Sequence, residues 1–124
     1  MIALETSSMI AYLSGEPGID VEAIDLAMQL KQSTFPPVVL MELLSDHTLS
    51  QETVDFLRQI PQLEILTGYW ERAGELRARL RRRGLKAHVA DTLIAQCCLD
   101  HDVTLITRDR DFRHFVRHAG LRLG

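Results

Sequence analysis

Acidic residues follow or interrupt the apolar runs of this chain at several places. Glu5 comes directly after the apolar run at 2–4, and Asp109 lies just behind the run at 103–107. Glu42 and Asp91 interrupt apolar stretches, where an ionised carboxylate is costly to bury unless a cation or hydrogen-bond donors compensate it. Taken singly, each acid has an ordinary explanation as a helix cap, a turn residue or a solvent-facing side chain.

Several carboxylates brought together would require a cation. Carboxylates in close contact repel one another, and a hard divalent ion relieves that repulsion. Ligand sets made only of oxygen favour Mg²⁺ or Mn²⁺ over softer metals. Such ions lower the pKa of bound water and stabilise charge on a phosphodiester. Convergence of these acids therefore predicts a metal-dependent nuclease, while a purely structural acid cluster remains the alternative.

The predicted elements would bring these acids to one edge of a sheet. Apolar periodicity predicts strands at 2–4, 63–67, 103–107 and 121–123, and helices at 8–13, 21–32, 50–60, about 67–83, 88–101 and 110–119, with a short helix after the double proline that carries Glu42. This order predicts an α/β protein with a three-layer α/β/α fold and a mainly parallel central sheet. Ligands of such folds gather at the carboxyl ends of the strands, where Glu5 and Asp109 lie.

Length and charge place the chain among ordinary globular proteins. The 124 residues are 46% hydrophobic, which predicts one domain over 1–124 with a core that needs no staples. Residues 1–64 hold ten acids against two Lys and Arg, whereas 65–124 hold seven against twelve. This asymmetry indicates an acidic pocket beside a basic surface, or two ordinary solvated faces. With neither a signal peptide nor a long apolar run, we expect a cytoplasmic protein without membrane association.

Three segments carry a resemblance to a known family. The sequences "MIALETSSMIAYL", "PPVVLMELL" and "HVADTLIAQCCLDHDVTLITRDRDF" resemble the PIN-domain ribonucleases, specifically the VapC-type toxins of bacterial and archaeal toxin–antitoxin systems. The resemblance covers essentially the whole chain. Its most specific part is the closing block, in which an Asp at a helix start is followed by "LIA" and then by a strand that ends in a Thr-Arg-Asp-x-Asp-Phe string.

The resemblance implies site residues, a cofactor and partners. The catalytic acids would be Glu5, Glu42, Asp91 and Asp109, with Asp111 as a nearby substitute for the last, and Mg²⁺ or Mn²⁺ would be held by Glu5, Asp91 and Asp109. Ser7 and Thr6 match the polar residues that hold metal, water or the scissile phosphate. The family further implies cleavage of RNA, often tRNA or rRNA, inhibition by a VapB-like antitoxin, and a homodimer.

One position departs from the family pattern. The family nearly always has Asp at the first acidic position, whereas this chain has Glu5. The extra methylene moves the carboxylate oxygens by about 1.5 Å, which hard-metal geometry tolerates poorly. We therefore expect weakened metal binding and attenuated activity.

Arginines gather in two groups of the basic half. One group lies between Arg72 and Arg83, and the other surrounds Asp109. Arg108 and Arg110 flank this acid and are the candidates for binding substrate phosphates, whereas a solvated face explains the first group equally well. His114 and His118, four residues apart, lack a third ligand at a fitting spacing and are predicted to be surface residues. Apolar residues between 10 and 30 could form a groove for an amphipathic partner segment, or simply belong to the core.

Two rival functions share parts of this pattern. A receiver-like phospho-acceptor domain also has a parallel sheet with clustered acids, but it would need a lysine where Arg108 stands and an acceptor Asp after the run at 63–67. A PIN-like module that binds RNA or protein without cleaving remains the second alternative. Metal binding with and without RNA degradation separates these possibilities.

Overall fold

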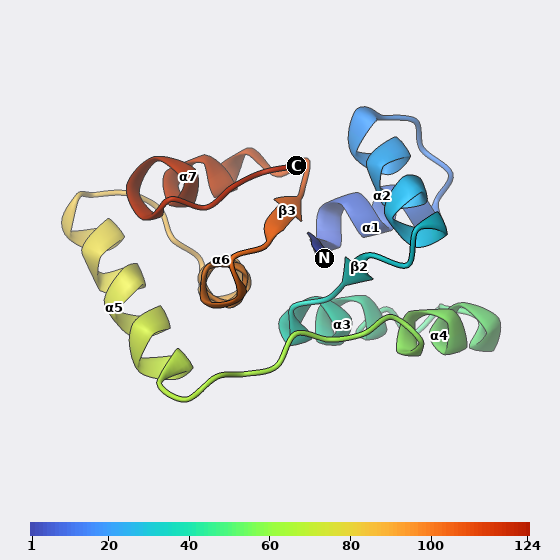
Figure 1. Ribbon diagram of the computed structural model, residues 1–124, viewed down its shortest axis with the longest axis horizontal. Coiled ribbons are helices and arrows are strands. Elements are labelled where there is room, and N and C mark those ends of the chain that lie inside the picture. The colour runs from blue at the N-terminus through green and yellow to red at the C-terminus, as the bar shows by residue number, and fades with distance from the viewer.

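A three-stranded parallel sheet forms the centre of the molecule. The computed structural model describes residues 1–124, and β1 (Ile2–Leu4) lies between β2 (Ser33–Thr34) and β3 (Thr104–Ile106). The register pairs Ala3 with Thr34 on one side and with Leu105 on the other. All three strands therefore end at the same edge of the sheet (Figure 1).

Helices cover both faces of this sheet, as Figure 1 shows. They are α1 (Thr6–Leu13), α2 (Ile19–Gln29), α3 (Pro37–Leu44), α4 (Gln51–Arg58), α5 (Tyr69–Arg82), α6 (Val89–His101), the 3₁₀ turn η1 (Arg110–Phe112) and α7 (Arg113–Ala119). Local signals fix their starts: Pro37 occupies the first turn of α3, and the hydroxyl of Ser50 caps α4 by accepting the Thr53 N–H at 3.1 Å. The predicted α/β/α fold is confirmed.

The core lies between the sheet and its helices. Ala3, Leu4 and Leu105 of the strands are completely buried, as are Ile94 of α6 and Phe112 of η1. At roughly 25 cal/mol for each Å² of apolar surface removed from water, side chains of this size contribute about 1.5–3 kcal/mol each. The same core therefore anchors the two elements, α6 and η1, that surround the acids.

Two predicted strands differ from the observed structure. The prediction of a strand at 63–67 is wrong, because only Gln62 forms a bridge, to Phe35, and Ile65 is exposed. At 121–123 the pairing is reduced to a single bridge between Leu105 and Leu123. The strand on the other side of β1 is instead the polar β2, which lacks the apolar alternation that marks a strand in sequence.

The charge asymmetry of the sequence is also an asymmetry in space. In Figure 1, α1 to α4 lie on one side of the strands and α5 to α7 lie on the other. The acidic first half and the basic second half consequently form opposite sides of the molecule. None of the helices is both long enough and apolar enough to cross a membrane.

Candidate metal and catalytic site

Glu5 lies where β1 ends and α1 begins. Its backbone N–H still bonds to the carbonyl of Ile106 in β3 at 3.0 Å, while its side chain caps α1. Glu5 Oε2 accepts the Ser7 N–H at 2.9 Å, the Ser7 hydroxyl, and the Thr107 hydroxyl at 2.8 Å. Although Glu5 is only 4% exposed, its other oxygen, Oε1, makes no hydrogen bond and is not fully buried. That oxygen is free for a ligand.

Three aspartates converge beside Glu5. One carboxylate oxygen from each of Asp91, Asp109 and Asp111 lies within 4.8 Å of the others. Asp91 comes from the first turn of α6, while the other two come from η1 and the residue before it. The backbone N–H of Asp111 donates to Asp109 Oδ1 at 2.9 Å and fixes the turn. The edge of the sheet therefore gathers acids from distant parts of the chain.

These acids have no cationic partner. The ion pairs of the molecule involve Asp20, Glu16, Asp100 and Asp102, so no Lys, Arg or His nitrogen lies within 4.0 Å of the convergent carboxylates. Burial, followed by the charges of Asp109 and Glu5, raises the pKa of Asp91 to about 6. Burial also raises the pKa of Glu5, although hydrogen bonds from Ser7 and Thr107 oppose the rise. Negative charge is therefore concentrated here at a free-energy cost to the fold.

Two acids elsewhere show how this fold treats a structural carboxylate. Arg72 binds Asp100 through Nε and Nη2, at 3.0 and 2.6 Å. Burial opposes ionisation of Asp100, but the hydrogen bonds of Arg72 and Gln96 hold its pKa below the ordinary value. The hydrogen bonds of Arg108 likewise hold the pKa of Asp20 well below its usual range. Structural acids here have arginine partners, and the convergent acids do not.

Glu42 lies next to this group but outside it. The hydroxyl of Thr6 donates to Glu42 Oε1 at 2.6 Å, and Thr6 is the residue directly after Glu5. The helix that carries Glu42, α3, packs against α1 and against α6, which carries Asp91. Glu42 and Asp91 are thus on neighbouring helices at the same edge. The group of three acids that could share a metal ion consists of Asp91, Asp109 and Asp111, and we call it the three-acid group. Glu5 was predicted as a metal ligand and is not part of this group, but it is close enough to raise the pKa of Asp91.

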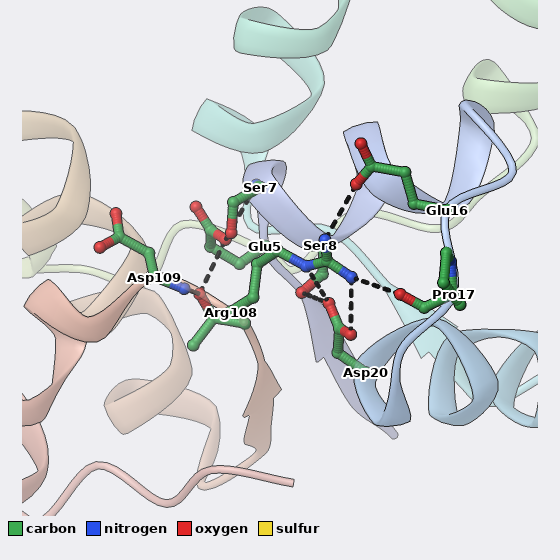
Figure 2. Close-up of polar contacts among 9 residues, drawn as sticks. Glu5, Ser7, Ser8, Glu16, Pro17, Asp20, Arg108 and Asp109 are labelled. Atoms are coloured by element: carbon green, nitrogen blue, oxygen red, sulfur yellow. Dashed lines mark hydrogen bonds and ion pairs between the residues drawn. The ribbon is translucent and has the colours of Figure 1, made fainter.

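The predicted substrate-binding residues fall into different surroundings. Ser7 donates its hydroxyl to Glu5, which orients this carboxylate (Figure 2). Figure 2 shows Arg108 extending away from Asp109 toward α2, where Nε and Nη2 bind Asp20 at 2.7 and 2.9 Å and Nη1 binds Glu16 at 2.9 Å. Arg110 is exposed and lines a hollow beside Asp109.

Arg108 therefore clamps the loop after β3 to the first turn of α2 and to the loop before it. Asp20 also accepts the hydroxyl of Ser8 at 2.7 Å, so the clamp joins α1 as well. The neighbouring Thr107 donates to Glu5 and accepts the Asp109 N–H at 3.0 Å. Sequence reasoning missed Thr107 and Asp20. The "LITRD" string held a signal for Thr107, but nothing local marks Asp20 as the partner of an arginine 88 positions away.

The donor set fits a hard divalent cation. Its ligands would be carboxylate oxygens only, which Mg²⁺ and Mn²⁺ prefer. Asp91 accepts no hydrogen bond from the protein. Every fully buried side-chain oxygen has a hydrogen-bond partner, so the unpartnered carboxylate oxygens of Asp91 are accessible to solvent. A bound cation would offset both causes of the raised pKa of Asp91, which are its burial and the charges of Asp109 and Glu5. The fold and the site together define a small α/β protein in which carboxylates that could hold a metal ion gather at the edge of a parallel sheet.

Comparison with known proteins agrees with this class. The sequence matches the family model of the PIN domain over residues 2–117. A search of the curated proteins finds no significant match. The chain belongs to the PIN domain family, and the predicted resemblance is confirmed at this level. VapC members of this family are typically nucleases, and a receiver-like domain is excluded.

Solved structures share the fold over nearly their whole length. The chain is similar to VapBC2 from Rickettsia felis, solved bound to a DNA fragment from its promoter, with 25% identity, a TM-score of 0.76, and coverage of 100% of this chain and 98% of that one. VapBC-1 from nontypeable Haemophilus influenzae gives 21% identity and a TM-score of 0.77, covering 100% and 97%. DNA-bound VapBC from Salmonella typhimurium gives 23% identity and a TM-score of 0.73, covering 100% and 98%.

Removing one repelling charge should stabilise the metal-free protein. The pKa of Asp91 is raised in the fold, so its ionisation lowers the free energy of unfolding. This destabilisation is fully present above about pH 6 and disappears as the pH falls toward the ordinary pKa of 3.8. We expect Asp91→Asn, in EDTA at pH 7.5, to raise the free energy of unfolding by about 1 kcal/mol after allowance for solvent screening. Urea denaturation at pH 7.5 and pH 4.5 measures the effect, which should shrink at the lower pH.

Asp20→Asn is the matched control for that measurement. Its folded pKa is lowered, so its contribution to stability is present at neutral pH and is lost as the pH falls. This variant should unfold at a lower urea concentration than the wild type at pH 7.5. The same sign of change in both variants would contradict the distinction between repelled and paired acids.

The Arg108 clamp predicts a difference between two nearby arginines. Arg108→Gln breaks bonds to Asp20 and Glu16, whereas Arg110→Gln removes an exposed side chain without an ion pair. We expect only Arg108→Gln to lower the melting temperature and to accelerate amide hydrogen exchange at Thr107 and Asp109. Equal exchange in both variants would show that the clamp does not order this loop.

Proposed function

We propose that this chain is a metal-dependent endoribonuclease and the toxin of a VapBC-like toxin–antitoxin pair. The observation that carries the proposal is the group of unpaired carboxylates formed by Asp91, Asp109 and Asp111, with Glu5 beside them. A structural cluster would be expected to have the arginine partners that Asp20 and Asp100 have. The PIN family match supports hydrolysis of phosphodiester bonds as the reaction.

Each side chain has a role that its contacts support. Asp91, Asp109 and Asp111 would hold Mg²⁺ or Mn²⁺, with Glu5 near enough to raise the pKa of Asp91. The ion would supply activation of water and stabilisation of charge on the phosphate. Ser7 and Thr107 favour the ionised form of Glu5 by donating to it. Glu42, positioned by Thr6, completes the acidic wall next to α1.

The apolar surface beside Glu42 supports the antitoxin part of the proposal. A hollow of about 260 Å³ lies among α1, α3 and the start of α4, lined by Ile10, Leu13, Ser14, Glu42, Leu43, Asp46, Leu49 and Thr53. Ile10 and the nearby Met41 are more than half exposed. An amphipathic segment with apolar residues and a basic one would complement this surface, and VapB-like antitoxins are the proposed source. A homodimer remains a prediction from the family.

The proposed reaction predicts Mn²⁺-dependent cleavage that depends on the unpaired acids. Asp91→Asn and Asp109→Asn should each lower the cleavage rate of a tRNA or rRNA substrate at least about 100-fold, because each removes a charged oxygen from the group. The measurement is the initial rate with purified RNA in Mn²⁺ and in EDTA.

Asp102→Asn is the control for these variants. Asp102 caps the far end of α6, in a left-handed conformation that Asn adopts readily, and its side chain is 85% exposed. The rate of this variant should stay within about twofold of the wild type. Cleavage that persists in EDTA, or that survives Asp109→Asn, would rule out the proposed site.

Glu5→Asp tests whether the longer side chain attenuates activity. Shortening it by one methylene, about 1.5 Å, restores the family residue at the position next to the three aspartates. We expect tighter Mn²⁺ binding by titration calorimetry and faster RNA cleavage. Equal affinity and equal rate in the two forms would remove the attenuation hypothesis. Mn²⁺ binding by both forms without any cleavage would instead support a binding module.

A further inference from the structure

The basic side of the molecule carries arginines that have no carboxylate partner. The ion pairs involve only three arginines, namely Arg72, Arg108 and Arg122. We use the name arginine track for the group Arg79, Arg83, Arg110, Arg113 and Arg117, all of which are exposed. Acids do lie near this group, since Asp111 follows Arg110 and Glu75 lines a hollow with Arg79, but none of them forms an ion pair with a member of the track.

Three members of the arginine track share one face of a helix. Arg110, Arg113 and Arg117 are spaced three and four residues apart along η1 and α7, which places their side chains in one stripe. Arg113 Nη1 donates to the carbonyl of Arg110 at 3.0 Å. Seven residues of helix extend about 10 Å, so the stripe presents a row of charges rather than a point.

The row continues onto the end of α5. Arg79 Nη2 donates to the carbonyl of His118 at 3.2 Å, which joins α5 to the last turn of α7. The pKa of His118 is lowered by desolvation and by the nearby charges of Arg83, Arg117, His114 and Arg79. Arg79, Arg83 and Arg117 therefore lie close to one another at this junction, around His118.

The other end of the arginine track lies beside the acid pocket, which is the site formed by Asp91, Asp109 and Asp111. Asp109, Arg110 and Arg113 line a common hollow of about 300 Å³, together with Thr107, Arg108 and Leu123. Asp109 is a member of the three-acid group. Arg110 and Arg113 therefore lie within reach of a phosphate chain that has one phosphate at these acids.

We propose that the arginine track binds the phosphate backbone of the RNA on one side of the scissile bond. The inference rests on the proposed ribonuclease function and adds to it a binding surface outside the acid pocket. A polyanion relieves the mutual repulsion of the arginines and gains free energy from the release of its counterions. Backbone binding of this kind carries no base specificity, so the track sets affinity and direction rather than sequence.

A charge-matched pair of double variants tests the track. The test variant is Arg113→Gln with Arg117→Gln. The control is Lys31→Asn with Arg58→Gln, which removes the only Lys and Arg of residues 1–64. Lys31 has a left-handed backbone (φ 55°), a conformation that Asn accepts. Binding of a fluorescent single-stranded 20-nucleotide RNA is measured by anisotropy in EDTA between 50 and 300 mM salt.

The expected result is a weakening of RNA binding that is specific to the track. We expect Kd to rise about tenfold or more for the track variant. The negative slope of the log binding constant against log salt concentration should become shallower by about 1.4, because each phosphate that is no longer neutralised makes it shallower by about 0.7. The control should stay within about twofold. Equal weakening in the two variants, or none in either, would overturn the proposal, as would polyglutamate competing for the track as well as polyuridylate does.

Two further measurements separate this proposal from the proposed function and from misfolding. Arg113→Lys with Arg117→Lys keeps the charges and should retain most of the binding, and failure to do so at an unchanged melting temperature would overturn a backbone role. In Mn²⁺, the cleavage rate of the track variant should fall at least about fivefold further on the 20-nucleotide RNA than on a trinucleotide. A wild type that cleaves neither RNA would refute the ribonuclease, while the anisotropy measurement would still decide the track.

Discussion

The mutual repulsion of carboxylates at one edge of the sheet is the constraint on which the rest of this molecule depends. Parallel pairing of β1 with β3 brings Glu5 and Asp109 to the same edge, and α6 adds Asp91. The fold holds Glu5 and Asp109 with neutral donors, namely hydroxyls and backbone N–H groups, rather than with arginines, and Asp91 accepts no hydrogen bond from the protein. Neutral donors orient a carboxylate without cancelling its charge, so the charge stays available to a ligand.

Arginine is used elsewhere to stabilise the frame around that pocket. Arg72 joins α5 to α6 through Asp100, and Arg108 joins the loop after β3 to Asp20. Asp20 and Asp100 consequently have lowered pKa values, whereas Asp91 has a raised one. The same residue type thus stabilises the fold where a cation is present and destabilises it where a cation is absent. Such a division is typical of sites that exchange stability for function.

Charge is also divided on the scale of the whole molecule. Residues 1–64, which include α1 to α4, hold ten of the seventeen acids, whereas residues 65–124, which include α5 to α7, hold twelve of the fourteen Lys and Arg. The two sets of helices lie on opposite sides of the strands. The acid pocket lies between them, with an apolar hollow beside Glu42 on one side and unpaired arginines beside Asp109 on the other. The apolar hollow borders Glu42 and the unpaired arginines border Asp109, so the two surfaces meet different members of the acidic edge from different directions.

The sequence by itself determined the elements and the acids but not their pairing. The apolar runs at 2–4 and 103–107, the cap at Ser50 and the helix that carries Asp91 follow local rules of periodicity and capping, which is why they could be predicted. Local rules failed at 63–67, where alternation without burial gave no strand, and at β2, whose polar Ser33 and Thr34 are strand only because β1 offers them an edge. Arg108 shows the same limit: the sequence places it beside Asp109, and only the tertiary structure reveals its ion pair with Asp20. Long-range packing decides which charged side chains meet, because their partners can lie many positions away in sequence, and a local pattern carries no information about such partners.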